Sequence, residues 1–322
     1  VLGTLLVSGC AAPEQPRSTA SVTPSAEQPS ADQEQLTEVG VGVLSIVDVA
    51  PLYLGMKEGI FEKHGLKILP EAAQGGAVIV TGVSSGQFQF GFSNVTSLAV
   101  ARDKGLGVKI VAPASASTGV VGEDYTAVMT SADSGIEDPA DLVGKRVAVN
   151  TLGNILDSTV SAALRQRGID PAGVKFVEMP FPDMVGQLNA GNVDAIVVSE
   201  PFVTVAKDDD NTVVLSNYAE ATEDLTVATY FAMEDYIEEN PEVVQRFQAA
   251  VVEAQEFAAA NPDQVRQILT EFTRMEADVA ERVILSKYPT EVNRDAIADV
   301  AEMAETDGLL KDADKVSDLV LD

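Results

Sequence analysis

The sequence predicts an α/β protein of two lobes, each built on a doubly wound parallel sheet covered by helices. Short apolar strands alternate with helical segments up to residue 112, and the same alternation starts again near residue 125. The chain has 322 residues and is 46% hydrophobic, which is enough for two lobes with cores of their own.

The first run of the pattern supplies four strands and the helices between them. Strands are expected at 39–47, 66–71, 88–92 and 108–112. The first helix begins near Pro51, which suits a helix start, and closes at His64-Gly65. The next two helices end at Gly86 and Gly105. This order predicts the first α/β lobe.

The second run begins with a strand at 125–130 and continues with strands at 146–149, 174–178, 194–198 and 212–215. Helices ending near Gly168 and Gly191 lie between them. A strand at 226–233 is expected to return the chain to the first lobe. From Tyr236 onward the pattern is helical, and Asn240-Pro241 and Asn261-Pro262 are typical of an N-cap followed by the first helical residue.

The charge of the chain excludes several classes of partner. There are 50 acidic and 21 basic residues, for a formal net charge of −29. Nucleic-acid binders need basic patches, and an anionic membrane attracts basic surfaces, so neither is an expected partner of the folded surface. The acidic surface suits solubility or a salty habitat.

The first 37 residues are interpreted as an export signal followed by a tether. Val7-Ser8-Gly9-Cys10 follows the apolar run VLGTLLV and resembles a bacterial lipobox, in which Cys10 is acylated. Residues 1–10 are therefore expected to be a signal-peptide remnant that begins inside its export signal. Residues 11–37 are rich in Pro, Ser, Ala, Gln and Glu and are expected to form a disordered tether. These features predict a lipid anchor at Cys10 and an extracytoplasmic location.

Polar loops follow several predicted strands at the point where a helix begins. They lie at 48–51, 74–76, 93–96 and 150–154. Ligands of open α/β sheets bind beyond the carboxyl ends of the strands, and helix starts offer unpaired N–H groups. Such residues also cap helices for structural reasons alone, but four loops from two units favour a cleft. The candidate ligand-binding residues in these loops are Asp48, Gly75, Gly76, Ser93, Asn94, Thr96, Asn150, Thr151 and Asn154.

Glu200 and Phe202 follow the strand at 194–198 and have two possible roles. They can present a carboxylate and an aromatic face to the cleft, or Glu200 can cap the following helix while Phe202 packs beneath it. If Glu200 and Asp48 both face the ligand, a ligand with hydrogen-bond donors is favoured. If they point away, the helix starts favour an anion.

Catalytic, cofactor and metal motifs do not emerge from the sequence. The single histidine, His64, is poorly placed for a Ser-His pair, and no GxSxG occurs. Gly75-Gly76 is not a GxGxxG motif, and one His with one Cys cannot make the ordinary zinc sites. We therefore expect a binding protein without a cofactor or metal, rather than an enzyme.

Four segments together resemble one large family. APLYLGMKEGIFEKHGL, AQGGAVIVTGVSSGQFQFGFSN, DPADLVGKRVAVNTLGN and LNAGNVDAIVVSEPF are similar in order and spacing to the substrate-binding proteins of ABC importers of the nitrate/sulfonate/taurine type. That family includes binders of a thiamine-pyrimidine precursor. The resemblance covers residues 39–207.

The resemblance implies a type II periplasmic-binding-protein fold with the ligand between the lobes. Lobe 1 would comprise 38–125 and 226–322, lobe 2 would comprise 126–225, and the crossovers would lie near 125 and 224–226. A monomer would close on a small solute and deliver it to an ABC permease with its ATPase. The alternative is a biosynthetic enzyme on the same fold that acts on a chorismate-derived or pyrimidine substrate. Nitrate, sulfonates, taurine and aminopyrimidines all remain open as ligands.

Two departures from the family pattern bear on the ligand. The chain has no Trp, so stacking would fall to Phe or Tyr. No Arg or Lys stands at the matching cleft positions, so an anion would depend on N–H and hydroxyl donors.

Overall fold

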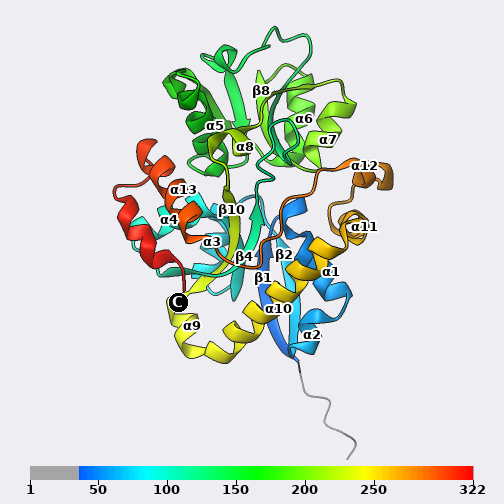
Figure 1. Cartoon of the computed structure of the whole chain (residues 1–322), viewed down its shortest axis with the longest axis vertical. Helices are drawn as coiled ribbons and strands as arrows, with labels where there is room; N and C mark the ends of the chain where they lie inside the picture. Colours follow the sequence, from blue (N-terminus) through cyan, green and yellow to red (C-terminus); the bar gives the residue numbers. More distant parts are fainter. Residues whose placement is uncertain (1–35, 322) are drawn as a thin grey trace, which may run out of the picture. The chain divides into compact units, whose positions relative to one another are not determined.

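Two five-stranded sheets organise the computed structural model, which describes residues 36–321. The first sheet has the order β2-β1-β3-β10-β4 and the second β7-β6-β8-β5-β9. Figure 1 labels β1, β2, β4 and β10 of the first sheet and β8 of the second. The first comprises β1 (Thr37–Val43), β2 (Leu66–Ala72), β3 (Phe90–Asn94), β4 (Val108–Ala116) and β10 (Thr226–Met233). The second comprises β5 (Thr126–Thr130), β6 (Arg146–Val149), β7 (Lys175–Glu178), β8 (Ala195–Ser199) and β9 (Thr212–Leu215). Two α/β lobes are therefore present.

The predicted signal remnant at 1–10, Cys10 and the tether up to residue 35 lie outside the described residues. The last residue assigned to the tether, Thr37, is the first residue of β1.

The prediction of purely parallel sheets is wrong for one inner strand of each lobe. β1 is parallel to β2 and β3, and β6 is parallel to β7 and β8. β10 is antiparallel to β3 and β4, and β5 is antiparallel to β8 and β9. β5 and β10 are the first strands after the chain passes from one sheet to the other. A chain that enters a sheet from the edge where the parallel strands end must run against them, and apolar periodicity carries no information on direction.

The segments 47–103 and 234–319 carry the helices α1 (Ala50–Lys57), α2 (Ile60–Lys63), α3 (Gly76–Ser84), α4 (Val95–Asp103), α9 (Glu234–Glu239), α10 (Pro241–Ala260), α11 (Pro262–Phe272), α12 (Ala277–Arg282) and α13 (Arg294–Thr306), with the 3-10 helices η1 (Val47–Val49) and η4 (Ala313–Leu319). The single helix expected from Pro51 to His64 is broken, because Gly59 has a left-handed φ of 71° between α1 and α2. Asn240 and Asn261 precede their helices as predicted, but neither side chain caps the helix that follows. Instead, the Asn240 amide donates to the Tyr236 carbonyl and the Asn261 amide donates to the Phe257 carbonyl, each in the helix before.

The second lobe carries α5 (Ile155–Gln166), α6 (Phe181–Asn189), α7 (Phe202–Asp208) and α8 (Asn217–Ala221), with η2 (Pro139–Leu142) and η3 (Pro171–Gly173). The short helix α8 falls in a stretch where the sequence predicts none. Asn217 of α8 is buried and donates to the Thr159 hydroxyl of α5 at 2.8 Å, which docks the helix.

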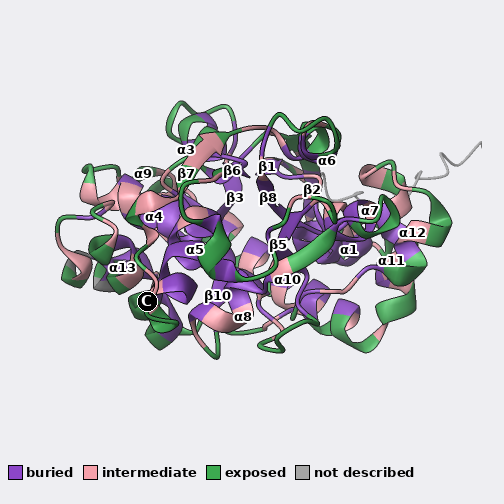
Figure 2. Cartoon of the chain, turned by 90° about the horizontal axis from the view of Figure 1, so that it is seen from above, coloured by how far each residue is buried: buried purple, intermediate pink, exposed green. Residues whose placement is uncertain are grey.

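The long helix α10 packs against α1 and β4 and closes the first core (Figure 1). Its Phe247 stacks on Phe90 of β3 with ring centroids 3.9 Å apart, and Tyr230 of β10 meets Phe247 edge-on at 5.7 Å. Buried residues follow the strands and the inner faces of the helices (Figure 2). The helix α10 therefore covers part of the first sheet. No helix within residues 36–321 is long and apolar enough to span a bilayer.

Candidate functional site

A small cavity lies between the lobes, at the carboxyl ends of the parallel strands. Its volume is about 30 Å³, and residues at the ends of β3 and β8 and just after β1 and β6 line it. The polar lining consists of Asp48, Gly76, Asn94, Asn150, Ser199 and Tyr218. The apolar lining consists of Leu44, Ile46, Phe92, Ile155, Leu156, Phe181, Val227 and Ala228. Of the predicted ligand-binding residues, Asp48, Gly76, Asn94 and Asn150 are thus brought together.

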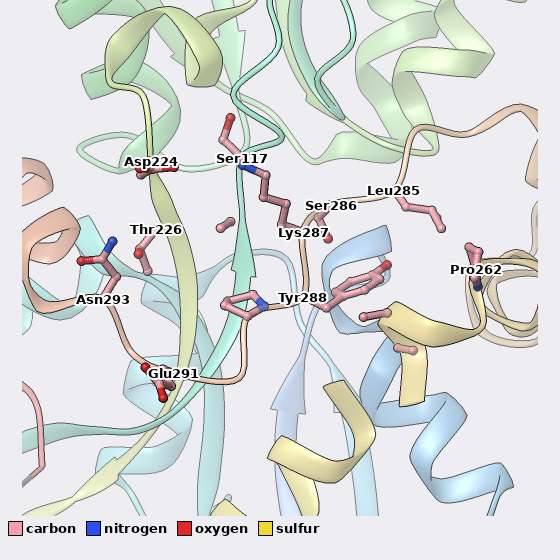
Figure 3. Close-up of a pocket in the computed structure, with 14 residues that line it drawn as sticks. Ser117, Asp224, Thr226, Pro262, Leu285, Ser286, Lys287, Tyr288, Glu291 and Asn293 are labelled. Carbon is pink, nitrogen blue, oxygen red and sulfur yellow. The ribbon is translucent and has the colours of Figure 1, made fainter. Parts of the chain in front are cut away.

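A larger pocket lies elsewhere and does not coincide with this site. A pocket of about 720 Å³ lies beside the crossovers, where residues 285–293 pass Ser117, Asp224 and Thr226 (Figure 3). None of the predicted ligand-binding residues lines it. We place the candidate site at the smaller cavity because strand ends and helix starts from both lobes converge there.

Asp48 is the single charged residue of the cavity lining. Its side chain is buried in η1, and Oδ1 accepts hydrogen bonds from Ser115 Oγ at 2.6 Å and from the Tyr125 hydroxyl at 3.1 Å. Oδ2 is buried with no hydrogen-bond partner among residues 36–321. Burial raises the pKa of Asp48 to about 6, against the opposing effect of the two hydroxyl donors. The site therefore holds an acceptor atom that is available to a ligand.

Gly75 and Gly76 stand where the start of α3 approaches other segments closely. A Cβ on Gly76 would lie 2.3 Å from Ser93 Oγ, and one on Gly75 would lie 2.7 Å from Thr151 Cγ2 in the other lobe. The φ of Gly75 is −173°, which any residue can adopt, so space rather than backbone conformation demands glycine here. Gly75 marks a direct contact between the lobes.

Asn94 has two roles at the end of β3. Its Oδ1 accepts a hydrogen bond from Ser97 N at 2.8 Å, which caps α4, and the residue also lines the cavity. Ser93 and Thr96 are fully buried beside it and do not line the cavity. Thr96 Oγ1 has no hydrogen-bond partner in the described part of the chain.

The loop after β6 is held by Asn154. Its Oδ1 accepts from Leu156 N at 2.7 Å and so caps α5. Its amide donates to Asn150 Oδ1 at 2.8 Å and to Thr151 Oγ1 at 2.5 Å. Because both ends of the Asn154 side chain are occupied and only Asn150 lines the cavity, Asn154 acts by positioning its neighbours.

The Glu200 carboxylate turns away from the cavity and caps α7. Oε2 accepts from Thr204 N at 3.0 Å, while Oε1 accepts from Thr204 Oγ1 at 2.9 Å and from Ile284 N at 3.2 Å. Burial raises the pKa of this carboxyl group. The Glu200 carbonyl accepts from Val47 N at 3.2 Å, so the residue joins the two lobes. Phe202 stacks on Phe181, with centroids 5.8 Å apart, beside the cavity rather than in its lining.

Tyr218, which lines the cavity, and Ser115 and Tyr125, which donate to Asp48, were not among the predicted site residues. Tyr218 comes from the unpredicted helix α8 and packs edge-on against Tyr125 at 5.7 Å. Ser115 lies in β4 beyond the predicted end of that strand at residue 112. Burial raises the pKa values of both tyrosines well above the ordinary value, so their hydroxyls are donors at neutral pH. A strand-then-polar-loop pattern could not have found these three residues.

Two α/β lobes with two crossings and a cavity between their strand ends define the periplasmic-binding-protein fold. The chain belongs to the NMT1/THI5-like family, whose model matches residues 46–265.

Relatives and structural neighbours include several binding proteins. The taurine-binding periplasmic protein of Escherichia coli (strain K12) is 28% identical over 230 residues, which cover 71% of this chain and 69% of that protein. The periplasmic aliphatic sulphonate binding protein SsuA from Escherichia coli superposes with a TM-score of 0.70 at 19% identity, covering 88% of this chain and 97% of that one. The periplasmic nitrate-binding protein NrtA from Synechocystis PCC 6803 gives a TM-score of 0.75 at 15% identity, with 89% and 86% covered.

One relative is an enzyme. The 4-amino-5-hydroxymethyl-2-methylpyrimidine phosphate synthase of Aspergillus parasiticus is 26% identical over 223 residues, which cover 66% of this chain and 64% of that protein.

Proposed function

We propose that the protein is the extracytoplasmic substrate-binding component of an ABC importer, and that it captures a small solute by closing its lobes. The observation that carries the proposal is that polar groups of both lobes meet in one cavity. Asp48 and Asn94 reach it from the first lobe, and Asn150, Ser199 and Tyr218 from the second. A ligand that contacts both lobes binds the closed arrangement better than the open one, and only such a difference shifts the equilibrium.

Two lobes with defined boundaries and a lipid anchor complete the proposed arrangement. Lobe 1 would be 38–125 with 226–322, lobe 2 would be 126–225, and the monomer would be held at the membrane through Cys10. The permease with its ATPase would receive the solute from the closed form. The inter-lobe contacts at Gly75 with Thr151 and at Val47 with Glu200 support closure as the motion that encloses the ligand.

The cavity size supports a small ligand. A water molecule occupies about 10–15 Å³ on this measure, so about 30 Å³ holds roughly two groups of that size. Nitrate, which a structural neighbour binds, and taurine, which a relative binds, are both small solutes, but taurine with its seven non-hydrogen atoms would extend beyond this cavity. Alkyl sulfonates and aminopyrimidines stay among the candidates.

A binding role is favoured over an enzymatic one. None of the cavity-lining residues is a histidine, cysteine or lysine. The single histidine, His64, pairs with Glu253 at 2.9 Å and does not line the cavity. The residues at hand can therefore bind and orient a solute but include no histidine–nucleophile pair.

A thermal-shift and calorimetric screen tests the proposal. Nitrate, taurine, alkanesulfonates and aminopyrimidines would be added to the purified chain. A true ligand at 100 times its Kd should add about 2.7 kcal/mol to the free energy of unfolding, and small-angle scattering should show compaction. Recovery of the ligand unchanged would support binding alone. Its conversion to a product would overturn the binding role in favour of the enzyme.

A further inference from the structure

A second pocket adjoins the ligand cavity. It has a volume of about 540 Å³ and shares Leu44, Ile46 and Phe181 with the lining of the cavity. Because three residues face both spaces, the two are neighbouring compartments at one inter-lobe opening. A ligand in the cavity has room to extend into the pocket.

The pocket is aromatic and draws on both lobes. Phe181 and Phe202 come from the second lobe and stack at 5.8 Å with an interplanar angle of 21°. Phe272, at the end of α11 in the first lobe, is held by Tyr53, with centroids 4.0 Å apart and rings 3° from parallel. Rings held in this way suit a flat, apolar ligand body.

Arg274 is the single charged residue that lines this pocket. It is exposed, and no carboxylate among residues 36–321 pairs with it. Its φ of 62° is in the left-handed region, which is unusual for a residue other than glycine, asparagine or aspartate. An exposed guanidinium on a pocket wall is suited to pairing with an anionic group of a ligand.

The neighbouring cavity carries a group of the opposite charge. Asp48 lines the cavity, and its Oδ2 is buried without a partner among the described residues. A buried carboxylate oxygen without a donor is costly, and a ligand N–H or O–H would relieve that cost. Nitrate and unsubstituted sulfonates lack such a donor.

We propose that cavity and pocket form one extended site for an organic anion with a flat apolar body and an N–H donor at its other end. The donor contacts Asp48, the body packs against Phe181, Phe202 and Phe272, and the anionic group faces Arg274. This inference rests on the proposed binding function and names the substrate class. The body of the ligand touches both lobes, because Phe181 and Phe202 come from the second lobe and Phe272 from the first, so closure is coupled to its binding.

Four probes separate the three contacts in isothermal titration calorimetry. 4-Aminobenzenesulfonate carries the ring, the amine and the anion. Benzenesulfonate lacks the amine, aniline lacks the anion, and taurine lacks the ring. We expect 4-aminobenzenesulfonate to bind at least tenfold more tightly than each of the others.

The variant R274Q should weaken binding of 4-aminobenzenesulfonate about tenfold and leave aniline unaffected. The matched control is K175Q, which removes one exposed positive charge from β7, away from both spaces, and should change neither affinity. The control accounts for the long-range effect of charge on anion binding.

Two outcomes overturn the inference. One is that R274Q binds 4-aminobenzenesulfonate as K175Q does, and the other is that taurine or nitrate binds more tightly than the aromatic probe. Either result leaves the proposed binding function standing. Failure of every solute in the earlier screen and of all four probes, with the protein folded by circular dichroism, would instead remove the proposed function itself.

Discussion

Replacing Gly75 with alanine tests whether binding depends on contact between the lobes. The new Cβ would lie 2.7 Å from Thr151 Cγ2, whereas carbon atoms in contact stand about 3.5–4.0 Å apart. Because the φ of −173° suits alanine, the first lobe itself is not strained, and the clash arises only when the lobes meet. Overpacking of this kind costs about 1–3 kcal/mol, so we expect affinity to fall roughly 5- to 150-fold.

Calorimetry with the ligand from the screen measures that loss, and small-angle scattering reports closure. The free energy of unfolding should change by less than about 0.5 kcal/mol. The double variant G75A/T151S should recover affinity, because serine removes Cγ2 and keeps the hydroxyl that accepts from Asn154. G186A is the matched control, since a Cβ there meets nothing within 4 Å. Wild-type affinity and compaction in G75A would refute the argument.

Three further substitutions have defined consequences. Asp48 has its pKa raised by burial to about 6, so ionisation costs the folded state roughly 3 kcal/mol. D48N should therefore be more stable than the wild type by up to about 3 kcal/mol at pH 8. That gap should close as the pH falls from about 6 to 4, and urea unfolding showing a wider gap in acid would contradict the reasoning. N154A should lower the free energy of unfolding by about 1 kcal/mol, because it removes the cap of α5. It should also weaken ligand affinity measured by calorimetry, because Asn154 positions the cavity loop. Unchanged affinity would count against that role. E200A should lower the free energy of unfolding by about 1–3 kcal/mol, since Thr204 N and Ile284 N lose their acceptor. E200Q should lower it less. Equal losses of stability in the two variants would argue against capping.

The sequence predicted the bounds of several strands correctly, because those bounds depend on residues close together in the chain. The bounds of β6, β9 and β10 match the expected residues, because short apolar runs between polar turns leave little freedom. Strand direction was not predictable, since β5 and β10 look like any buried strand. The break at Gly59 was missed because the apolar spacing continues across it.

The site residues likewise divide into those with a local sequence pattern, which were predicted, and those without one, which were not. Asn94 and Asn150 were predicted because each follows a strand, where the fold gathers ligands. Tyr125 and Tyr218 reach the region from a crossover and from a five-residue helix, which have no such local pattern. For Glu200, two roles were open, and only the contacts with Thr204 and Ile284 distinguish a cap from a cleft residue.

The position of β10 between β3 and β4 means that the first sheet cannot be completed until late in the synthesis of the chain. Strands β1 to β4 emerge first, yet β3 and β4 do not pair with one another and wait for residues 226–233 to fill the gap between them. All five strands of the second sheet lie within residues 126–215, so that sheet is complete before the missing strand of the first arrives. The lobe that begins the chain is thus the last to be finished.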